Sequence, residues 1–459
     1  MLAYIVLIPG LLPAWVGFRR SPQAAFLLVY LPTLFLLPEY YRLDLPGVPS
    51  PTFSQAAALG TATAFFARRA PGYRFTPTDL LILGFALSVA LSEYFAGGYK
   101  DAQNLAWNMM AWAVLPYLFA KSMVEPLGLR IRFAQTIVLL LAAVAVISVY
   151  EFRFGATPWR MILDNFFPWG GRSWVTTFRW GFARTAGPYG HAILAGILMV
   201  VAFRIQRWLE WSQAWAPRPL VAPWLPMSQA RLITLVLVAG VIMTMVRGPW
   251  IGAILAALVV LIGRSPQRGL AIAGIVAGGL LIGIPGGMWF YDYVSVGRAG
   301  ALTVAQETAA YRWELLTEYG AISREQFWFG WGLTAWPKVP GMESIDNYYL
   351  LLLLMHGVLG LGFFLAIIVS MLFRLLRSGL SEPLADPAGS SLAFTLASVY
   401  VVFILSVATV YLGLQAVPLL FLITGWAEGY LRANRGFAMA TEQAARPVPP
   451  SHGFRRVLA

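Results

Sequence analysis

Cysteine is absent from this chain of 459 residues, and histidine occurs only as His191, His356 and His452. Without thiols the protein has no disulfide, no cysteine metal site and no thiolate nucleophile. Three scattered histidines do not predict a multi-histidine metal site. The sequence also contains no P-loop, dinucleotide-binding fingerprint or zinc motif. We therefore expect that the protein uses neither a metal ion nor a cofactor.

Charged residues are scarce too, since they make up 12% of the chain, against 59% hydrophobic residues and a mean hydropathy of +0.69. Soluble domains carry about 25% charged residues, so a water-soluble globule could not hide this much apolar surface. The apolar residues form continuous blocks, and about 20 helical residues cross a bilayer core about 30 Å thick. Because backbone groups in lipid must be paired within their own segment, such blocks predict membrane-spanning helices.

The apolar blocks predict an all-α, polytopic transmembrane helix bundle of about 12–13 spans. Prolines interrupt the region up to residue 38, so its spans are the least regular. The blocks lie near 2–17, 23–38, 52–67, 78–95, 102–120, 131–151, 188–206, 230–246, 249–263, 269–288, 346–373, 391–412 and 415–431.

Basic residues predict the orientation of the bundle, because Lys and Arg are retained in cytoplasmic loops. Alternate loops, from Arg19-Arg20 to the tail after Arg432, carry most of them. The same retention explains the net charge of +13, so we expect no nucleic-acid partner. We expect a transmembrane domain over 1–433, with large outer loops at about 152–187 and 289–345. A disordered cytoplasmic tail is expected over 434–459.

The second outer loop has the composition of a folded segment. Residues 305–322 place Ala309, Trp313, Leu316 and Gly320 on one stripe, which predicts an amphipathic helix on the membrane surface. The aromatic and glycine-rich segment 327–332 follows, and its composition suits the membrane interface.

Three arginines at the outer ends of predicted spans are candidates for an anion site. Arg247 stands in a tight turn between two apolar blocks, Arg184 where an outer loop enters the next span, and Arg312 on the amphipathic helix. Guanidinium groups stay charged and match phosphate oxygens bidentately, so together they would suit phosphate or pyrophosphate. Alternatively, Arg247 snorkels to the interface, and Arg312 belongs to a solvated face with Glu314 and Glu318.

The segment Asp346-Asn347-Tyr348 opens a long apolar run and allows two interpretations. Asp and Asn at this position can cap the helix. Alternatively, Asp346 lies beside the arginines and accepts a proton from an attacking hydroxyl. His191 and His356 are interpreted either as polar residues of helix packing or as catalytic groups.

The order of these pieces resembles the superfamily of O-antigen ligases and Wzy-type polysaccharide polymerases. The resemblance is carried by Arg184, Gly187 and His191, by Val246-Arg247-Gly248, by Tyr311-Arg312-Trp313, by Phe329-Gly330-Trp331-Gly332, and by Asp346-Asn347 with Leu350, Gly357 and Gly360. In that superfamily the spans surround an outer-leaflet site that takes a glycan from undecaprenyl pyrophosphate. Arginines hold the pyrophosphate, and a residue at the start of the span after the large periplasmic loop assists the acceptor hydroxyl.

The resemblance implies a metal-independent membrane glycosyltransferase of the bacterial inner membrane, with its active site facing the periplasm. It implies pyrophosphate binding by three arginines, catalysis at the start of the span after the large periplasmic loop, and three supporting residues. These are Arg184, Arg247 and Arg312, then Asp346 and Asn347, then His191, Tyr348 and Glu318.

One departure from the superfamily pattern bears on the acceptor. Ligases that act on lipid A typically carry His-Asn or His-His where this chain has Asp346-Asn347. This favours polymerisation of a lipid-linked repeat unit, in surface polysaccharide or exopolysaccharide biosynthesis, over ligation to lipid A or to protein. The expected partners are an undecaprenyl-pyrophosphate-linked glycan, an acceptor glycan, membrane lipids and a chain-length regulator. A lipid-linked oligosaccharide flippase or anion transporter is the alternative from another class, although transporters place charged groups near the bilayer midplane.

Overall fold

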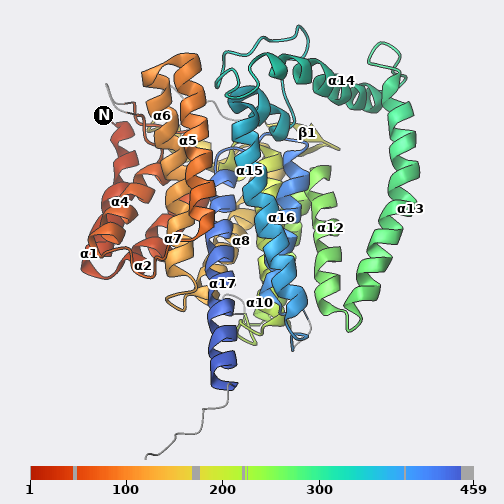
Figure 1. Cartoon of the computed structure of the whole chain (residues 1–459). Coiled ribbons are helices and arrows are strands. Elements are labelled where there is room, and N and C mark those ends of the chain that lie inside the picture. The colour runs from red at the N-terminus through yellow and green to blue at the C-terminus, as the bar shows by residue number, and fades with distance from the viewer. Residues whose placement is uncertain are drawn as a thin grey trace, which may run out of the picture.

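The computed structural model describes residues 2–44, 49–167, 176–219, 223–224, 226–386 and 389–445, and helices dominate them (Figure 1). The helices of the bundle are α1 (Ile8–Arg19), α2 (Pro22–Ala25), α3 (Leu31–Leu36), α4 (Phe53–Ala67), α5 (Pro77–Gly97), α6 (Tyr99–Met109), α7 (Leu115–Met123), α8 (Arg130–Phe154), α10 (Ala192–Trp211), α11 (Gln229–Met243), α12 (Arg247–Arg264), α13 (Arg268–Ser295), α15 (Tyr348–Ser381), α16 (Leu392–Val407) and α17 (Ala416–Ala445).

Smaller elements join these helices or cover the end of the bundle at which α10, α12 and α15 begin, which is called the outer end after its predicted orientation. The 3-10 helix η1 (Leu2–Leu7) precedes α1, and π-helical turns join α2 to α3 and α6 to α7. The remaining short elements are the π-helical turns η2 (Phe26–Tyr30) and η3 (Met110–Val114), α9 (Pro158–Leu163), the antiparallel strands β1 (Phe178–Arg179) and β2 (Phe182–Ala183), η4 (Gly187–Tyr189) and α14 (Val304–Glu325).

Six of the described helices are long and apolar enough to cross a membrane: α5, α8, α10, α12, α13 and α15. Shorter apolar helices over Ala3–Arg19, Pro22–Leu36, Gln229–Met243 and Leu392–Val407 accompany them. The prediction of an all-α polytopic membrane bundle is confirmed. The protein is a multi-pass membrane protein.

Helix α15 lies between α5 on one side and α16 on the other, and α12 packs along α16 (Figure 1). Helix α13 stands at the edge of the bundle, and its apolar window has no buried residue. Lipid is therefore the natural cover for α13. Helix α17 extends to Ala445, beyond the boundary expected at 433, and residues 446–459 of the expected tail lie outside the described residues.

Helix α15 is broken inside the predicted span, at Gly357, whose φ is 63° and ψ −168°. The outer segment 327–332 inserts at the break and pairs with it. The N–H groups of Trp331 and Gly332 donate to the carbonyls of Leu354 and Met355, and the N–H groups of Val358 and Leu359 donate to the carbonyls of Phe327 and Trp328. These are the helix groups that the break would otherwise leave unpaired, so irregular backbone is tolerated here.

The predicted amphipathic helix exists as α14, and the face that it buries against the rest of the protein is not the predicted stripe. Its buried residues are Gln306, Ala310, Leu315, Tyr319 and Ser323. Trp313 and Leu316 of the predicted stripe stay exposed, at 39% and 44%. The cause is local packing, because Tyr319 donates a hydrogen bond to the carbonyl of Met342 in the segment leading to α15. Contact of the exposed stripe with the membrane surface stays a prediction.

Candidate functional site

The loop before α10 is held in place by Glu151, a fully buried residue near the end of α8. Its carboxylate accepts hydrogen bonds from the backbone N–H groups of Ala186, at 3.1 Å, and Gly187, at 2.8 Å. The hydroxyl of Thr157 donates a third, at 3.2 Å. A carboxylate that accepts several hydrogen bonds fixes the backbone around it. Glu151 thereby sets the path of the segment that carries Arg184.

Arg184 follows β2 and lies against the end of α11. Its guanidinium is within hydrogen-bond distance of the Thr244 carbonyl, at 3.5 Å, and the Thr177 hydroxyl, at 3.3 Å. The backbone N–H of Thr185 donates to the carbonyl of Met243 at 3.2 Å. Burial, and next the positive charge of Arg179, lower the pKa of Arg184. An anion beside these two arginines would relieve their repulsion.

Arg247 is the first residue of α12 and follows the turn that Arg184 contacts. In this turn Met245 has a φ of +50°, an uncommon conformation for a side chain of this size. Its carbonyl accepts a hydrogen bond from the Arg179 guanidinium at 2.7 Å. The side chain of Arg247 is exposed and has no hydrogen-bond or ion-pair partner among the described residues. The turn therefore brings Arg179, Arg184 and Arg247 to one outer surface.

His191 lies on the same side, as the N-cap of α10. Its Nδ1 accepts a hydrogen bond from the backbone N–H of Ile193 at 3.1 Å, and its ring contacts that of Tyr411, with centroids 6.4 Å apart. Burial, helped by the charge of Arg184, lowers the pKa of His191 to about 4. The imidazole is therefore neutral near pH 7. Its position indicates a capping and packing role beside the arginines.

The structure separates the roles of Asp346 and Asn347, which the sequence left together. Asn347 is the N-cap of α15, and its Oδ1 accepts from the N–H of Leu350 at 3.1 Å. Asp346 does not cap; its half-buried carboxylate accepts a hydrogen bond from Ser344 at 3.2 Å. Tyr348 lies within the first turn, with its ring packed against Phe364 at 5.4 Å between centroids. Asp346 is therefore available for chemistry, whereas Asn347 and Tyr348 are engaged in building the helix.

Arg312 and Glu318 lie on α14 with exposed side chains, and neither has a hydrogen-bond or ion-pair partner within the described ranges. Tyr311, next to Arg312, donates a hydrogen bond to the carbonyl of Ser344 at 2.7 Å. Burial, and next the charge of Asp346, raise the pKa of Tyr311. The backbone of Arg312 is therefore held near Asp346 by its neighbour.

The outer end of α16 connects the two groups of candidate residues. The Tyr349 hydroxyl at the start of α15 donates to the carbonyl of Ile404 at 2.9 Å. A side chain at Gly248, next to Arg247, would lie 3.0 Å from the Thr409 hydroxyl just after α16. The helices that begin near Asp346 and Arg247 thus both contact one short stretch, residues 404–409. Both groups of candidate residues therefore lie at the end of the bundle where α12 and α15 begin.

Residues 232–365 match the family model described as O-antigen ligase. The matched segment runs from α11 into α15 and includes Arg247, Arg312 and Asp346. The resemblance drawn from the sequence is thereby confirmed over this part of the chain. None of the curated proteins compared with the chain matches it. The O-antigen ligase match indicates a function of the glycan ligase or polymerase type, with a lipid-linked glycan and an acceptor as substrates.

Two residues outside the matched segment 232–365 were missed by the sequence reasoning. Arg179 sits in the hairpin before Arg184, and Glu151 ends a predicted span. A signal existed for Glu151, because an acidic residue inside an apolar block is a functional candidate by default. Nothing in the local sequence distinguishes Arg179 from other loop arginines. Among the described residues, no group of three or more His, Asp and Glu side chains could hold a metal ion.

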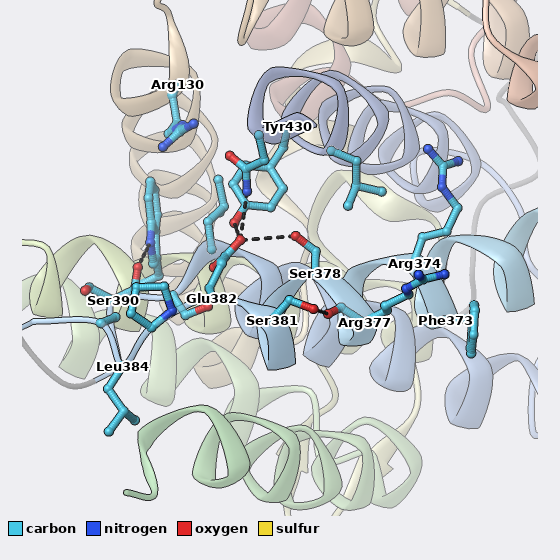
Figure 2. A pocket seen from close by; sticks show the side chains of 17 residues that line it. Arg130, Phe373, Arg374, Arg377, Ser378, Ser381, Glu382, Leu384, Ser390 and Tyr430 are labelled. Carbon is cyan, nitrogen blue, oxygen red and sulfur yellow. Dashed lines mark hydrogen bonds between the residues drawn. The ribbon is translucent and has the colours of Figure 1, made fainter. Parts of the chain in front are cut away.

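A cavity of about 830 Å³ lies at the opposite end of the bundle, where α15 ends (Figure 2). The Glu382 carboxylate in it accepts hydrogen bonds from Ser378, Tyr430 and Asn434 (Figure 2). Two arginines of its lining are held by carboxylates, Arg130 by Glu125 and Arg374 by Glu428. No candidate residue from the sequence lines this cavity, whose polar groups join α15 to α17.

Proposed function

We propose that the protein is a polysaccharide polymerase of the bacterial inner membrane. It transfers an oligosaccharide from undecaprenyl pyrophosphate to an acceptor glycan on the periplasmic side, in surface polysaccharide or exopolysaccharide biosynthesis. The proposal rests on the O-antigen ligase match and on the basic outer surface formed by Arg179, Arg184 and Arg247.

The single observation that carries the proposal is the arrangement around Arg247. Its exposed guanidinium has no partner among the described residues, and it follows a turn whose backbone is held by Arg179 and Arg184. A pyrophosphate leaving group accumulates negative charge as the glycosidic bond breaks. Arginine forks donate two parallel hydrogen bonds to such oxygens and stay charged. Preorganised donors of this kind stabilise the transition state more than the ground state.

In the proposed reaction a hydroxyl oxygen of the acceptor attacks the anomeric carbon of the lipid-linked sugar. The bond from that carbon to the phosphate oxygen breaks, and undecaprenyl pyrophosphate leaves on the arginines. Asp346 takes the hydroxyl proton as the general base. Arg312 supports the pyrophosphate from α14. Asn347 keeps the start of α15, and therefore Asp346, in position.

Polymerisation is preferred to ligation because an aspartate stands at position 346, where lipid A ligases typically carry histidine. Arg247→Ala tests the proposal with purified protein and a lipid-linked repeat unit. We expect loss of polymer, and little recovery in Arg247→Lys, because lysine lacks the bidentate fork. Gln326→Ala, an exposed change on the same outer side, is the control. If Arg247→Ala formed polymer as fast as Gln326→Ala, Arg247 would not bind the leaving group.

A further inference from the structure

Helix α6 carries a polar stripe in a region that the sequence predicts to be membrane-spanning. Lys100, Asn104 and Asn108 recur every four residues and share one face, with Gln103 beside them. Asn108 accepts a hydrogen bond from Gln55 at 2.8 Å. The exposed amides of Gln103 and Asn104 have no partner among the described residues. Amides left without a polar partner are costly when they are removed from water, so this face suits a polar ligand.

The stripe lines a cavity of about 820 Å³ at the outer end of the bundle. Two cationic residues, Arg42 and Lys100, and two acidic ones, Glu93 and Asp101, also line it. The remaining polar groups are amides and hydroxyls, together with the exposed ring of Tyr99. The charges balance, so the lining does not select a strongly charged molecule. Amides donate and accept hydrogen bonds at once, as sugar hydroxyls do.

The cavity adjoins an apolar groove of about 800 Å³ between α1, α4 and α6, and Pro49 and Gln103 line both. The groove is lined almost entirely by apolar side chains, including Leu11, Leu59 and Trp107. Its floor is formed by the close approach of α1 to α4, since a side chain at Gly60 would lie 1.9 Å from the Gly10 carbonyl. A polar cavity thus lies next to a groove suited to a hydrocarbon chain.

We propose that this composite site binds the acceptor, a lipid-linked saccharide with its sugars in the cavity and its hydrocarbon chain in the groove. The inference rests on the proposed function and adds a second substrate site to it. The adjacency of the polar and apolar parts points to an amphiphile, and the balanced charge with unpaired amides points to a hydroxyl-rich head group.

The site is placed for a two-substrate reaction. The cavity is lined by Leu333 and Thr334, which follow the segment inserted into α15, and Glu93 accepts a hydrogen bond from the N–H of Leu333 at 2.7 Å. Helix α15, with Asp346 at its outer end, separates α5 and α6 from the side of α12 and the β1 hairpin (Figure 1). The acceptor and the arginine-bound donor would therefore approach Asp346 from opposite sides.

The test counts lipid-linked repeat units bound per purified full-length chain, by native mass spectrometry. We expect two for the wild type. Gln103→Ala combined with Asn104→Ala should weaken one of them by about tenfold or more, because each lost hydrogen bond costs about 0.5–1.5 kcal/mol. Ala106→Trp, which fills the groove, should remove the same one. Gln326→Ala and the peripheral Ala277→Trp are the matched controls and should bind two.

Arg247→Ala should lose the other molecule, which separates the two sites. Two molecules bound with wild-type affinity by both the amide and the groove variants would overturn the acceptor site. Equal displacement of the second molecule by phosphatidylglycerol would do so as well, because the groove would then hold bulk lipid. Either result leaves the proposed function standing if Arg247→Ala still abolishes polymer. Normal polymer from Arg247→Ala, with the amide effect intact, would instead count against the proposed function alone.

Discussion

Gly357→Ala is expected to expel the inserted segment from the break in α15. The backbone angles of Gly357 lie in a region that only glycine adopts readily, and forcing alanine into such a region costs roughly 1–3 kcal/mol. The new methyl group would also lie 2.4 Å from the carbonyl carbon and oxygen of Trp328. Because these are backbone atoms, a rotamer change cannot relieve the overlap. The inserted segment has to move.

The expected loss of stability follows from the hydrogen bonds that α15 can form again and those that the inserted segment 327–332 cannot. If α15 straightens, the Val358 and Leu359 N–H groups can pair with the Leu354 and Met355 carbonyls in the ordinary helical pattern. Two of the four bonds at the break are then lost, at roughly 1 kcal/mol each. The contact of Phe329 with Phe95, at 4.8 Å between centroids, is worth roughly 0.5–1.5 kcal/mol. We expect a net destabilisation of about 3 kcal/mol.

The absence of cysteine makes the assay direct, because Phe329→Cys introduces the only thiol of the chain. A membrane-impermeant maleimide should label this thiol slowly in the Gly357 background and rapidly with Gly357→Ala. Gly362→Ala is the matched control, since it lies in the same helix and a side chain there meets no atom within 4 Å. Labelling and thermal stability of Gly357→Ala equal to those of Gly362→Ala would refute the reasoning.

Further predictions concern the candidate site and the topology. Asp346→Asn should lower polymer formation by about 10²–10⁴-fold without destabilising the protein. Asn347→Ala should instead lower the stability of the protein by about 1 kcal/mol. Equal rates of polymer formation, or equal melting curves, for the two variants would contradict these roles. Glu151→Gln should cost roughly 1–3 kcal/mol, because one of two backbone N–H groups loses its acceptor; an unchanged melting temperature would argue against that role. His191 has a folded pKa of about 4, below its ordinary 6.5, so its contribution to stability should be constant above pH 6.5 and fall toward pH 4; His191→Asn should flatten this fall. An alkaline phosphatase fusion at Gly300 should be active, and inactivity there with an active cytoplasmic reporter would reverse the predicted orientation.

Much of the helical architecture is predictable from sequence because hydropathy measures contact with lipid, which each span experiences separately. The break at Gly357 is not predictable in this way. Residues 346–373 form one apolar run, and the reason for the break lies in a distant segment that supplies the missing hydrogen bonds. The sequence predicts an interface turn around Gly330 and Gly332. In the structure these glycines allow their backbone to approach α15 and α5 closely.

The candidate arginines are predictable because a charge at the end of a span is rare and needs a reason. The way they come together is not predictable, since Arg179 and Arg184 reach the turn before Arg247 through the carbonyls of Met245 and Thr244. For Asp346 and Asn347 the sequence offers two adjacent caps of equal quality. The local backbone path determines that Asn347, and not Asp346, accepts the hydrogen bond from the N–H of Leu350.

This division between neighbouring residues affects how the chemistry can change during evolution. Because residue 347 secures the start of α15, substitutions at residue 346 do not weaken the helix. A lineage can therefore exchange one proton acceptor for another at position 346, and adjust to a new acceptor hydroxyl, without a compensating change elsewhere in the membrane domain. Under the proposed mechanism, position 346, which carries the base, can vary, whereas position 347, which caps the helix, has to keep a capping side chain.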